Sequence, residues 1–159
     1  MTSYARLTPV WMTLLTLALA PAAEAAIQID RGIAGARLGN SRADVRKALG
    51  KPASTQQGRN DFGRWVSYRY AGKITVFFQG RELVSSVQTA GLGDRTAAGI
   101  GVGSTETELT KSLKGLTCED VGANVRTCHT GDFLPGRRVT DFRLSNGKVE
   151  SVTVARVVD

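Results

Sequence analysis

Apolar and polar side chains alternate along six stretches of the chain, which is the pattern of half-buried β-strands. The stretches are residues 65–70, 74–79, 83–89, 125–128, 139–144 and 149–157. Short turns rich in Gly, Lys or Asn separate them, among them Asn146-Gly147, a dipeptide typical of tight hairpins. The pattern therefore predicts two antiparallel meanders of three strands each.

Two further stretches, residues 41–49 and 105–113, have apolar side chains four positions apart, the spacing of one helical face. Each begins with a capping box, in which a Ser or Thr is followed three residues later by an acid. The pairs are Ser41 with Asp44 and Thr105 with Glu108. We predict a short helix in each stretch, docked on a sheet because helices of this length are marginal alone.

The two halves of the chain repeat each other at an offset of 64 residues. The matched positions are Gly35/Gly99, Leu38/Val102, Gly39/Gly103, Ser41/Thr105, Asp44/Glu108, Val45/Leu109, Lys47/Lys111 and Leu49/Leu113. We predict a first repeat at residues 26–95 and a second at 96–159, combined in one globular domain because each unit alone buries too little. The expected class is α+β: two tandem helix-plus-antiparallel-meander repeats forming one sheet of six to eight strands, with helices on one face.

Residues 1–25 have the layout of a secretory signal peptide. Arg6 precedes an apolar run at residues 10–20, and a small-residue tail leads to a cleavage site after Ala25. The run is shorter than a bilayer span, so we favour a cleaved signal over a retained membrane helix and expect no integral membrane span in the mature chain. No Cys lies near the site, and we expect a non-lipidated protein that is secreted or periplasmic.

Cys118 and Cys128 are the two cysteines of the chain. Disulfides form and persist after export, so we predict a bridge between them. The alternative is a metal site that uses both thiolates and His129, the single histidine. A structural zinc needs four ligands, so we favour the disulfide and expect no metal.

Composition and charge favour binding over catalysis. The sequence lacks a Gly-x-Ser-x-Gly motif, and its one histidine leaves little scope for a Ser/His/Asp set, so we expect no enzyme and no cofactor. Gly99, Gly101 and Gly103 precede a predicted helix, where a phosphate cradle is one reading and a plain entry turn is the one we favour.

The formal charge is +7, and arginine outnumbers lysine by fourteen to six in residues 26–159. Such a surface favours anionic partners. The cations are spread over both halves with no regular interleaving of aromatics, and we expect no nucleic-acid binding.

Aromatic and loop residues are the candidates for partner binding. Alternation places Trp65 on the strand face opposite Tyr68 and Tyr70, so either set faces outward as an interface anchor, or both fill the core or cover its edge. Phe133 and Leu134 are two bulky residues in a turn-rich run, suited to insertion into a partner or to folding back over the disulfide. Arg137 and Arg138 follow and would surround that tip with positive charge.

The doubled unit carries a family resemblance. Each copy opens with a glycine turn before a capped helix, and the second ends in Gly147-Lys148-Val149-Glu150-Ser151-Val152. The whole resembles the tandem repeat of the β-lactamase-inhibitor-protein-like fold, and each half is similar to the SmpA/OmlA-type outer-membrane assembly lipoproteins. The resemblance implies a secreted, non-enzymatic binding protein whose open sheet face engages a protein partner. The alternative is a basic module that binds anionic envelope polymers by charge.

Overall fold

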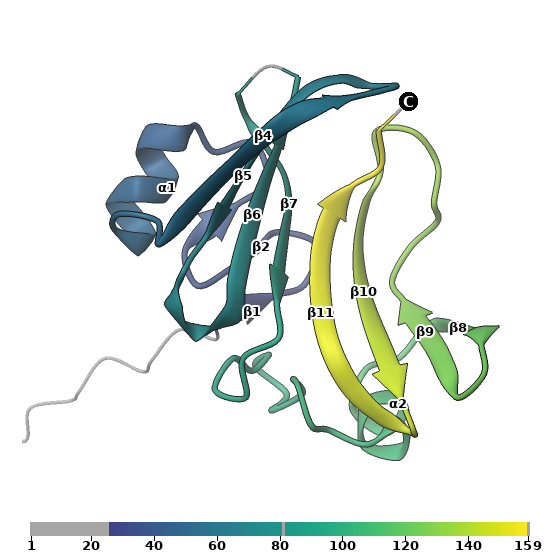
Figure 1. Ribbon diagram of the computed structural model, residues 1–159. Coiled ribbons are helices and arrows are strands. Elements are labelled where there is room, and N and C mark those ends of the chain that lie inside the picture. Colours follow the sequence, from purple (N-terminus) through teal and green to yellow (C-terminus); the bar gives the residue numbers. More distant parts are fainter. Residues whose placement is uncertain (1–25, 81, 159) are drawn as a thin grey trace, which may run out of the picture.

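An eight-stranded antiparallel sheet dominates the computed structural model, which describes residues 26–80 and 82–158 (Figure 1). The predicted signal peptide lies outside the described residues. Within those residues no helix has the length and apolar character needed to cross a membrane.

Each half of the chain contributes four consecutive strands to this sheet. They are β4 (Ser54–Asn60), β5 (Gly63–Arg69), β6 (Ile74–Gln79) and β7 (Val84–Thr89), then β8 (Thr117–Gly122), β9 (Val125–His129), β10 (Arg138–Ser145) and β11 (Lys148–Arg156). The spatial order is β4-β5-β6-β7-β11-β10-β9-β8. The two meanders therefore meet through their last strands, and β4 and β8 form the outer edges.

A second layer covers one face of the sheet (Figure 1). It consists of helices α1 (Arg42–Leu49) and α2 (Glu106–Ser112) and a small sheet of β1 (Ile27–Gln28), β2 (Gly32–Ile33) and β3 (Ala36–Arg37). A 3-10 turn, η1 (Ala71–Lys73), joins β5 to β6. Both predicted helices and their capping boxes are confirmed, with the Ser41 and Thr105 side chains accepting hydrogen bonds from the Asp44 and Glu108 backbone amides.

The hydrophobic core lies between the large sheet and this second layer. Alternate strand residues point into it, including Val66, Tyr68, Val76, Phe78, Val87, Phe142, Leu144, Val152 and Val154. Each helix adds one fully buried side chain, Val45 from α1 and Leu109 from α2. The opposite face of the sheet has no helix over it in the part of the chain that the structure describes (Figure 1).

The expected α+β class is wrong, because the chain is mostly β, with 49% strand and 14% helix. The difference comes from strands that lack an apolar alternation. The sequence of β4 is Ser-Thr-Gln-Gln-Gly-Arg-Asn, and the strand is exposed along its whole length, as an edge strand can be. β8 is similarly polar, and β1, β2 and β3 have two residues each. Each meander consequently has four strands where the pattern predicted three.

The two halves are built alike in their hydrogen bonds. The amide of Gly39 donates to the carbonyl of Val84 over 2.9 Å, and that of Gly103 donates to Val149 over 2.7 Å. Both the β6–β7 and the β10–β11 ladders shift register two residues before the end of the earlier strand. The proposed boundary between residues 95 and 96 stays a prediction.

Candidate functional site

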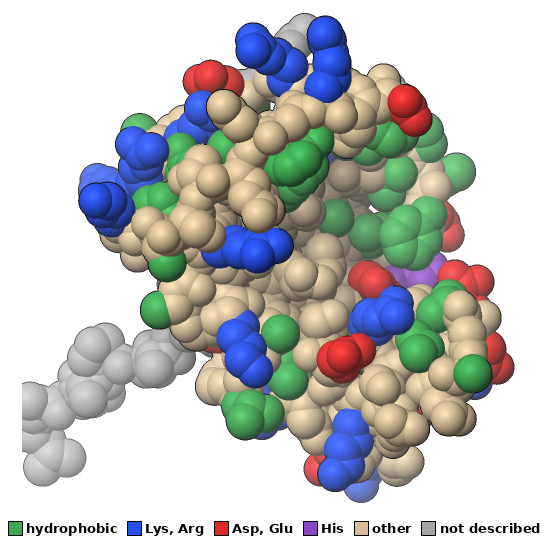
Figure 2. Space-filling model, viewed as in Figure 1, with side chains coloured by type: hydrophobic (Ala, Val, Ile, Leu, Met, Phe, Trp, Pro, Cys, Tyr) green, Lys and Arg blue, Asp and Glu red, His purple; other side chains and the backbone are tan. Residues whose placement is uncertain are grey.

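The uncovered face of the large sheet, which we call the open face, is the candidate site. One row of side chains runs directly across it, each opposite the next on the neighbouring strand: Arg69, Thr75, Gln88, Thr153, Asp141 and His129. Figure 2 shows this face hollowed along its middle, with Lys and Arg side chains numerous on the side of α1 and β4. The row is polar throughout, so the floor of the hollow offers hydrogen-bonding groups.

Trp65 and Phe77 form an aromatic pair on the first-half side of the open face. Their rings are stacked, with centroids 5.4 Å apart and planes inclined by 26°, and both side chains are half-buried. Gly58 lies directly opposite Trp65 on β4. A Cβ at Gly58 would lie 2.7 Å from Trp65 Cζ2, so glycine is needed for the indole to lie over β4.

Tyr68 and Tyr70 are on the covered face instead. Tyr68 is 2% exposed, its ring meets Phe78 edge-on at 4.9 Å, and Arg46 Nη2 donates to its hydroxyl over 3.1 Å. Tyr70 is also buried, and burial, together with Tyr68, raises the pKa of its hydroxyl against the lowering effect of Arg46. Of the three arrangements considered from the sequence, the structure has Trp65 on the open face and both tyrosines in the core.

Asp141 is the acidic residue at the second-half side of the row, on β10. Burial raises the pKa of its carboxyl above 3.8, against the opposing charges of His129 and Arg143 and a hydrogen bond with Thr127. Its Oδ1 is buried and has no hydrogen-bond partner in the part of the chain that the structure describes. Buried polar atoms are normally paired, so this oxygen is an acceptor that a ligand's N–H or O–H group would satisfy.

The loop between β9 and β10 borders the open face beside His129 (Figure 1). The Phe133 ring packs edge-on against the His129 ring, with the ring centroids 4.5 Å apart. Phe133 and Leu134 stay 52% and 53% exposed. Arg137 and Arg138 are exposed as well, and the Arg137 amide closes a turn by donating to the Leu134 carbonyl over 3.0 Å.

The structure thus gathers Phe133, Leu134 and Arg137 on one loop, with Arg138 next to it at the start of β10, and puts Trp65 on the other half of the sheet. The sequence reasoning missed Asp141 as a site residue. A signal for it exists, since the alternation that points Phe142 into the core points Asp141 to the opposite face.

The predicted disulfide between Cys118 and Cys128 is confirmed, and it joins directly opposed residues of β8 and β9. Glu106 with these two cysteines is the one group of three potential metal ligands in the described residues. Sulfur atoms bonded to each other are not thiolates, so in this oxidised form the group does not have the donors of a metal site.

No protein-family model matches the sequence, and no curated protein matches it either. Among solved structures, the uncharacterized protein yfeY from Escherichia coli has a TM-score of 0.51 and 12% identity over 84% of this chain and 99% of its own. A DUF4309 family protein (YjgB) from Bacillus subtilis has a TM-score of 0.50 and 19% identity over 78% of this chain and 84% of its own.

An extracellular protein with an SCP domain from Bacillus anthracis has a TM-score of 0.49 and 11% identity over 90% of this chain, which spans 50% of that protein's length. The likeness to the first two structures shows a shared β-rich fold. It does not show the β-lactamase-inhibitor-like or SmpA/OmlA-type family.

Proposed function

We propose that the protein is an exported, non-enzymatic binding module that engages a protein partner through its open face. The observation that carries the proposal is a hollowed sheet face with a half-buried Trp65–Phe77 pair upon it (Figure 2). Aromatic side chains with one free surface dominate the energetics of many protein interfaces. The tandem-repeat resemblance in the sequence supports the same use of the sheet.

Polar groups on the same face supply the means for specificity. The unpartnered Oδ1 of Asp141 accepts a donor from the partner, and Gln88 and Thr153 beside it offer both donors and acceptors. A partner that leaves Asp141 unsatisfied is penalised, so this residue selects among candidate surfaces.

Two features support export. Residues 1–25 have the sequence pattern of a signal peptide, and the Cys118–Cys128 disulfide is typical of oxidising compartments. We therefore place the working protein in the periplasm or outside the cell.

A second candidate function is charge-driven binding to anionic envelope polymers, which the net charge of +7 favours. The two functions differ in their response to salt, because contacts between exposed charges are screened whereas buried apolar contacts persist.

The test is co-purification of the exported protein from its own culture at low and at moderate salt, with wild type, Trp65→Ala and Phe62→Ala. Phe62 is an aromatic residue 51% exposed at the β4–β5 turn, outside the open face, and serves as the matched control. A salt-tolerant, stoichiometric complex weakened about 30-fold by Trp65→Ala and unchanged by Phe62→Ala supports the proposal. If the protein is retained only at low salt, and equally with and without the Trp65→Ala substitution, the result supports polymer binding instead.

A further inference from the structure

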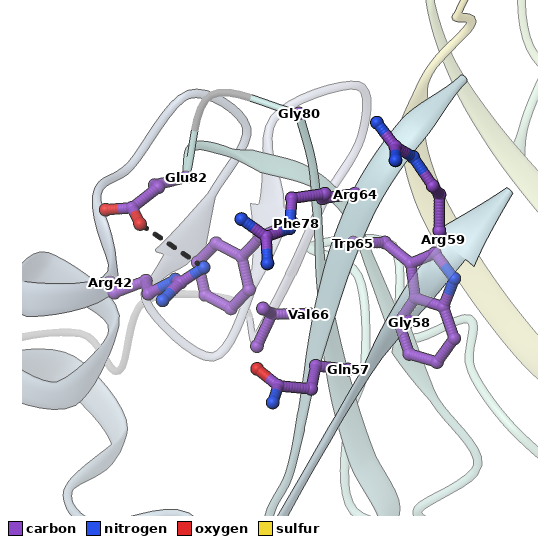
Figure 3. Close-up of a pocket in the computed structure, with 10 residues that line it drawn as sticks. All are labelled: Arg42, Gln57, Gly58, Arg59, Arg64, Trp65, Val66, Phe78, Gly80 and Glu82. Atoms are coloured by element: carbon purple, nitrogen blue, oxygen red, sulfur yellow. Dashed lines mark ion pairs between the residues drawn. The ribbon is translucent and has the colours of Figure 1, made fainter.

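A cavity of about 580 Å³ lies on the covered side of the sheet, between the start of α1 and the edge of the sheet where β4 ends, β5 begins and β6 ends. Its floor is apolar, formed by the buried side chains of Val66 and Phe78. Arg42, Arg64 and Gln57 stand around that floor (Figure 3). Most of the lining is polar, so the cavity offers several charged and hydrogen-bonding groups around a small apolar base.

The lining has an excess of positive charge. Among the described residues that line it are three arginines, Arg42, Arg59 and Arg64, and one acid, Glu82. Arg42 Nη2 lies 3.6 Å from Glu82 Oε1, but the Glu82 side chain is 71% exposed, so this ion pair is weak.

Two of these arginines, Arg42 and Arg64, share the cavity with Val66 and Phe78. Arg42 Nε is buried without a hydrogen-bond partner among the described residues, and the Arg42 guanidinium lies 5.8 Å from the centre of the Phe78 ring. Arg64 lines the same cavity, and in Figure 3 its side chain is on the same side of the strand as Val66 and Phe78, while Trp65 points to the other side. Two guanidinium groups thus face one small volume, a geometry that suits the oxygens of a carboxylate or phosphate.

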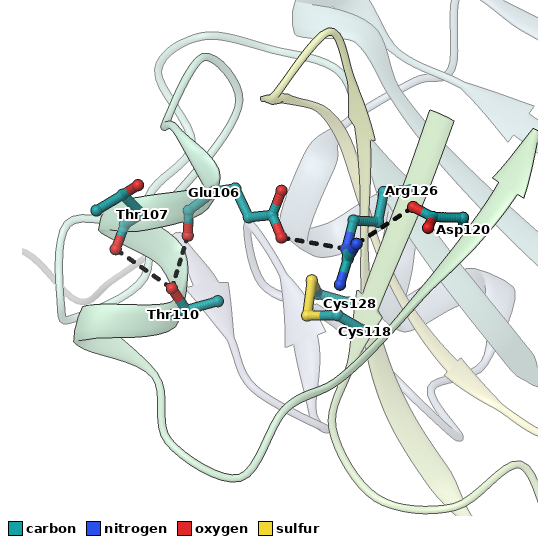
Figure 4. A network of polar contacts seen from close by, with 7 residues as sticks. All are labelled: Glu106, Thr107, Thr110, Cys118, Asp120, Arg126 and Cys128. Carbon is teal, nitrogen blue, oxygen red and sulfur yellow. Dashed lines mark hydrogen bonds and ion pairs between the residues drawn. A yellow bond between two sulfur atoms is a disulfide. The ribbon is translucent and has the colours of Figure 1, made fainter. Parts of the chain in front are cut away.

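At the equivalent position in the second half of the chain, ion pairs within the chain take the place of an open cavity. Arg126 Nε lies 3.1 Å from Glu106 Oε1, and Arg126 Nη1 lies 3.2 Å from Asp120 Oδ1 (Figure 4). One cation is therefore held between two acids beside the Cys118–Cys128 bridge, so the arginine is compensated by side chains of the same chain.

In the first half the same three positions hold Arg42, Gln57 and Val66. Arg42 follows its N-cap residue just as the helix acid of the second half does, and Gln57 faces Val66 across the outer ladder as the strand acid faces its arginine. Both acids are therefore missing here, and the helix position has reversed its charge. An anion from outside the chain would supply the negative charge that the second half carries on its own side chains.

We propose that this cavity binds a small organic anion, in which a carboxylate or phosphate is joined to an apolar group. The anionic head accepts hydrogen bonds from Arg42 and Arg64, and the apolar part packs on Val66 and Phe78. The site lies on the face of the sheet opposite the proposed partner surface, so it functions whether or not the open face is occupied.

The experiment is a titration of the exported, disulfide-bonded protein followed by the amide NMR shifts. Octanoate and octyl phosphate are the probes, with acetate, inorganic phosphate and octyltrimethylammonium for comparison. We expect shifts in the first turn of α1 and at the β4–β5 hairpin for the two octyl anions, with the tighter one identifying the preferred head group. Acetate and phosphate should bind about tenfold more weakly or worse, because they lack the apolar contact.

Arg42→Gln and Arg64→Gln should each weaken octyl-anion binding about tenfold or more, the effect of losing hydrogen bonds to a charged group. Arg69→Gln is the matched control, because Arg69 is on the same strand as Arg64 but on the open face. Thermal unfolding of each variant separates loss of binding from loss of fold. An equal loss in Arg69→Gln, equal binding of the octyl cation, or shifts confined to the open face would overturn the proposal.

Discussion

Substitution of Gly58 perturbs the candidate site directly. The Trp65 indole occupies the space that a side chain at position 58 would fill. The φ of Gly58 is not in the left-handed region, so Gly58→Ala is compatible with the backbone. The new Cβ would lie 2.7 Å from Trp65 Cζ2 and 2.9 Å from Cε2, whereas ordinary contacts begin at 3.4 Å. The indole must therefore move by about 0.7 Å or more, away from its stacked position on Phe77.

The expected change in the free energy of unfolding is small because two effects oppose each other. Loss of the stacked geometry costs about 0.5–1.5 kcal/mol. Replacing glycine by alanine at a compatible position stabilises by about 0.4–1 kcal/mol through the unfolded chain. We expect a net change within about 1 kcal/mol, together with an altered environment for Trp65.

Fluorescence reports that environment directly, since Trp65 is the one tryptophan in residues 26–159. Gly58→Ala should shift the emission maximum to longer wavelength and increase acrylamide quenching. Gly122→Ala is the matched control on edge strand β8, where the nearest atom to a new Cβ is Val125 Cβ at 4.0 Å. Unchanged emission in Gly58→Ala, or the same shift in both variants, would refute the packing of Trp65 over β4.

Three further predictions concern stability. Replacing Cys118 and Cys128 together by Ala should lower the free energy of unfolding by about 2.5–3 kcal/mol, because the bridge closes a loop of about eleven residues; equal urea midpoints for variant and wild type would contradict this. Thr105→Ala should cost about 1 kcal/mol by removing the side-chain cap of α2, with the exposed Thr107→Ala as a control that leaves the melting temperature unchanged. The pKa of Asp141 is raised in the folded protein, so ionisation of its carboxyl lowers the free energy of unfolding as pH rises above 3.8. Asp141→Asn should therefore be more stable than wild type near about pH 7 and equal to it near about pH 3. The opposite pH trend in urea titrations would contradict a pKa raised by burial.

Much of the strand and helix content could be predicted, because it depends on local patterns that the structure uses directly. Alternation marks the central strands, whose two faces differ in environment, as in β6, where Val76 is buried and Phe77 is half-buried. The Ser41 and Thr105 capping boxes depend on residues within one turn. The disulfide could be predicted because the chain has two cysteines and the pattern of an export signal.

The fold class was predicted wrongly because the edge strands, which raise the strand content, carry no such pattern. Both faces of β4 see solvent, so neither selects for apolar side chains, and its pairing with β5 depends on a hairpin that polar residues form equally well. The sequence also did not determine which face of the sheet carries Trp65, because alternation shows only that Trp65 and Tyr68 point to opposite faces. Long-range packing of β1–β3 and α1 against the tyrosine side decides it.

Site-directed photo-crosslinking in culture tests the central claim, that the open face receives a protein partner. A photoreactive residue at Gln88 sits exposed on central strand β7 in the middle of the polar row, and one at Lys47 sits exposed on α1 on the other side of the sheet. The account predicts one discrete adduct from position 88 that Trp65→Ala abolishes, and none from position 47. The same adduct from position 47, or an adduct at position 88 that persists in Trp65→Ala, would contradict it.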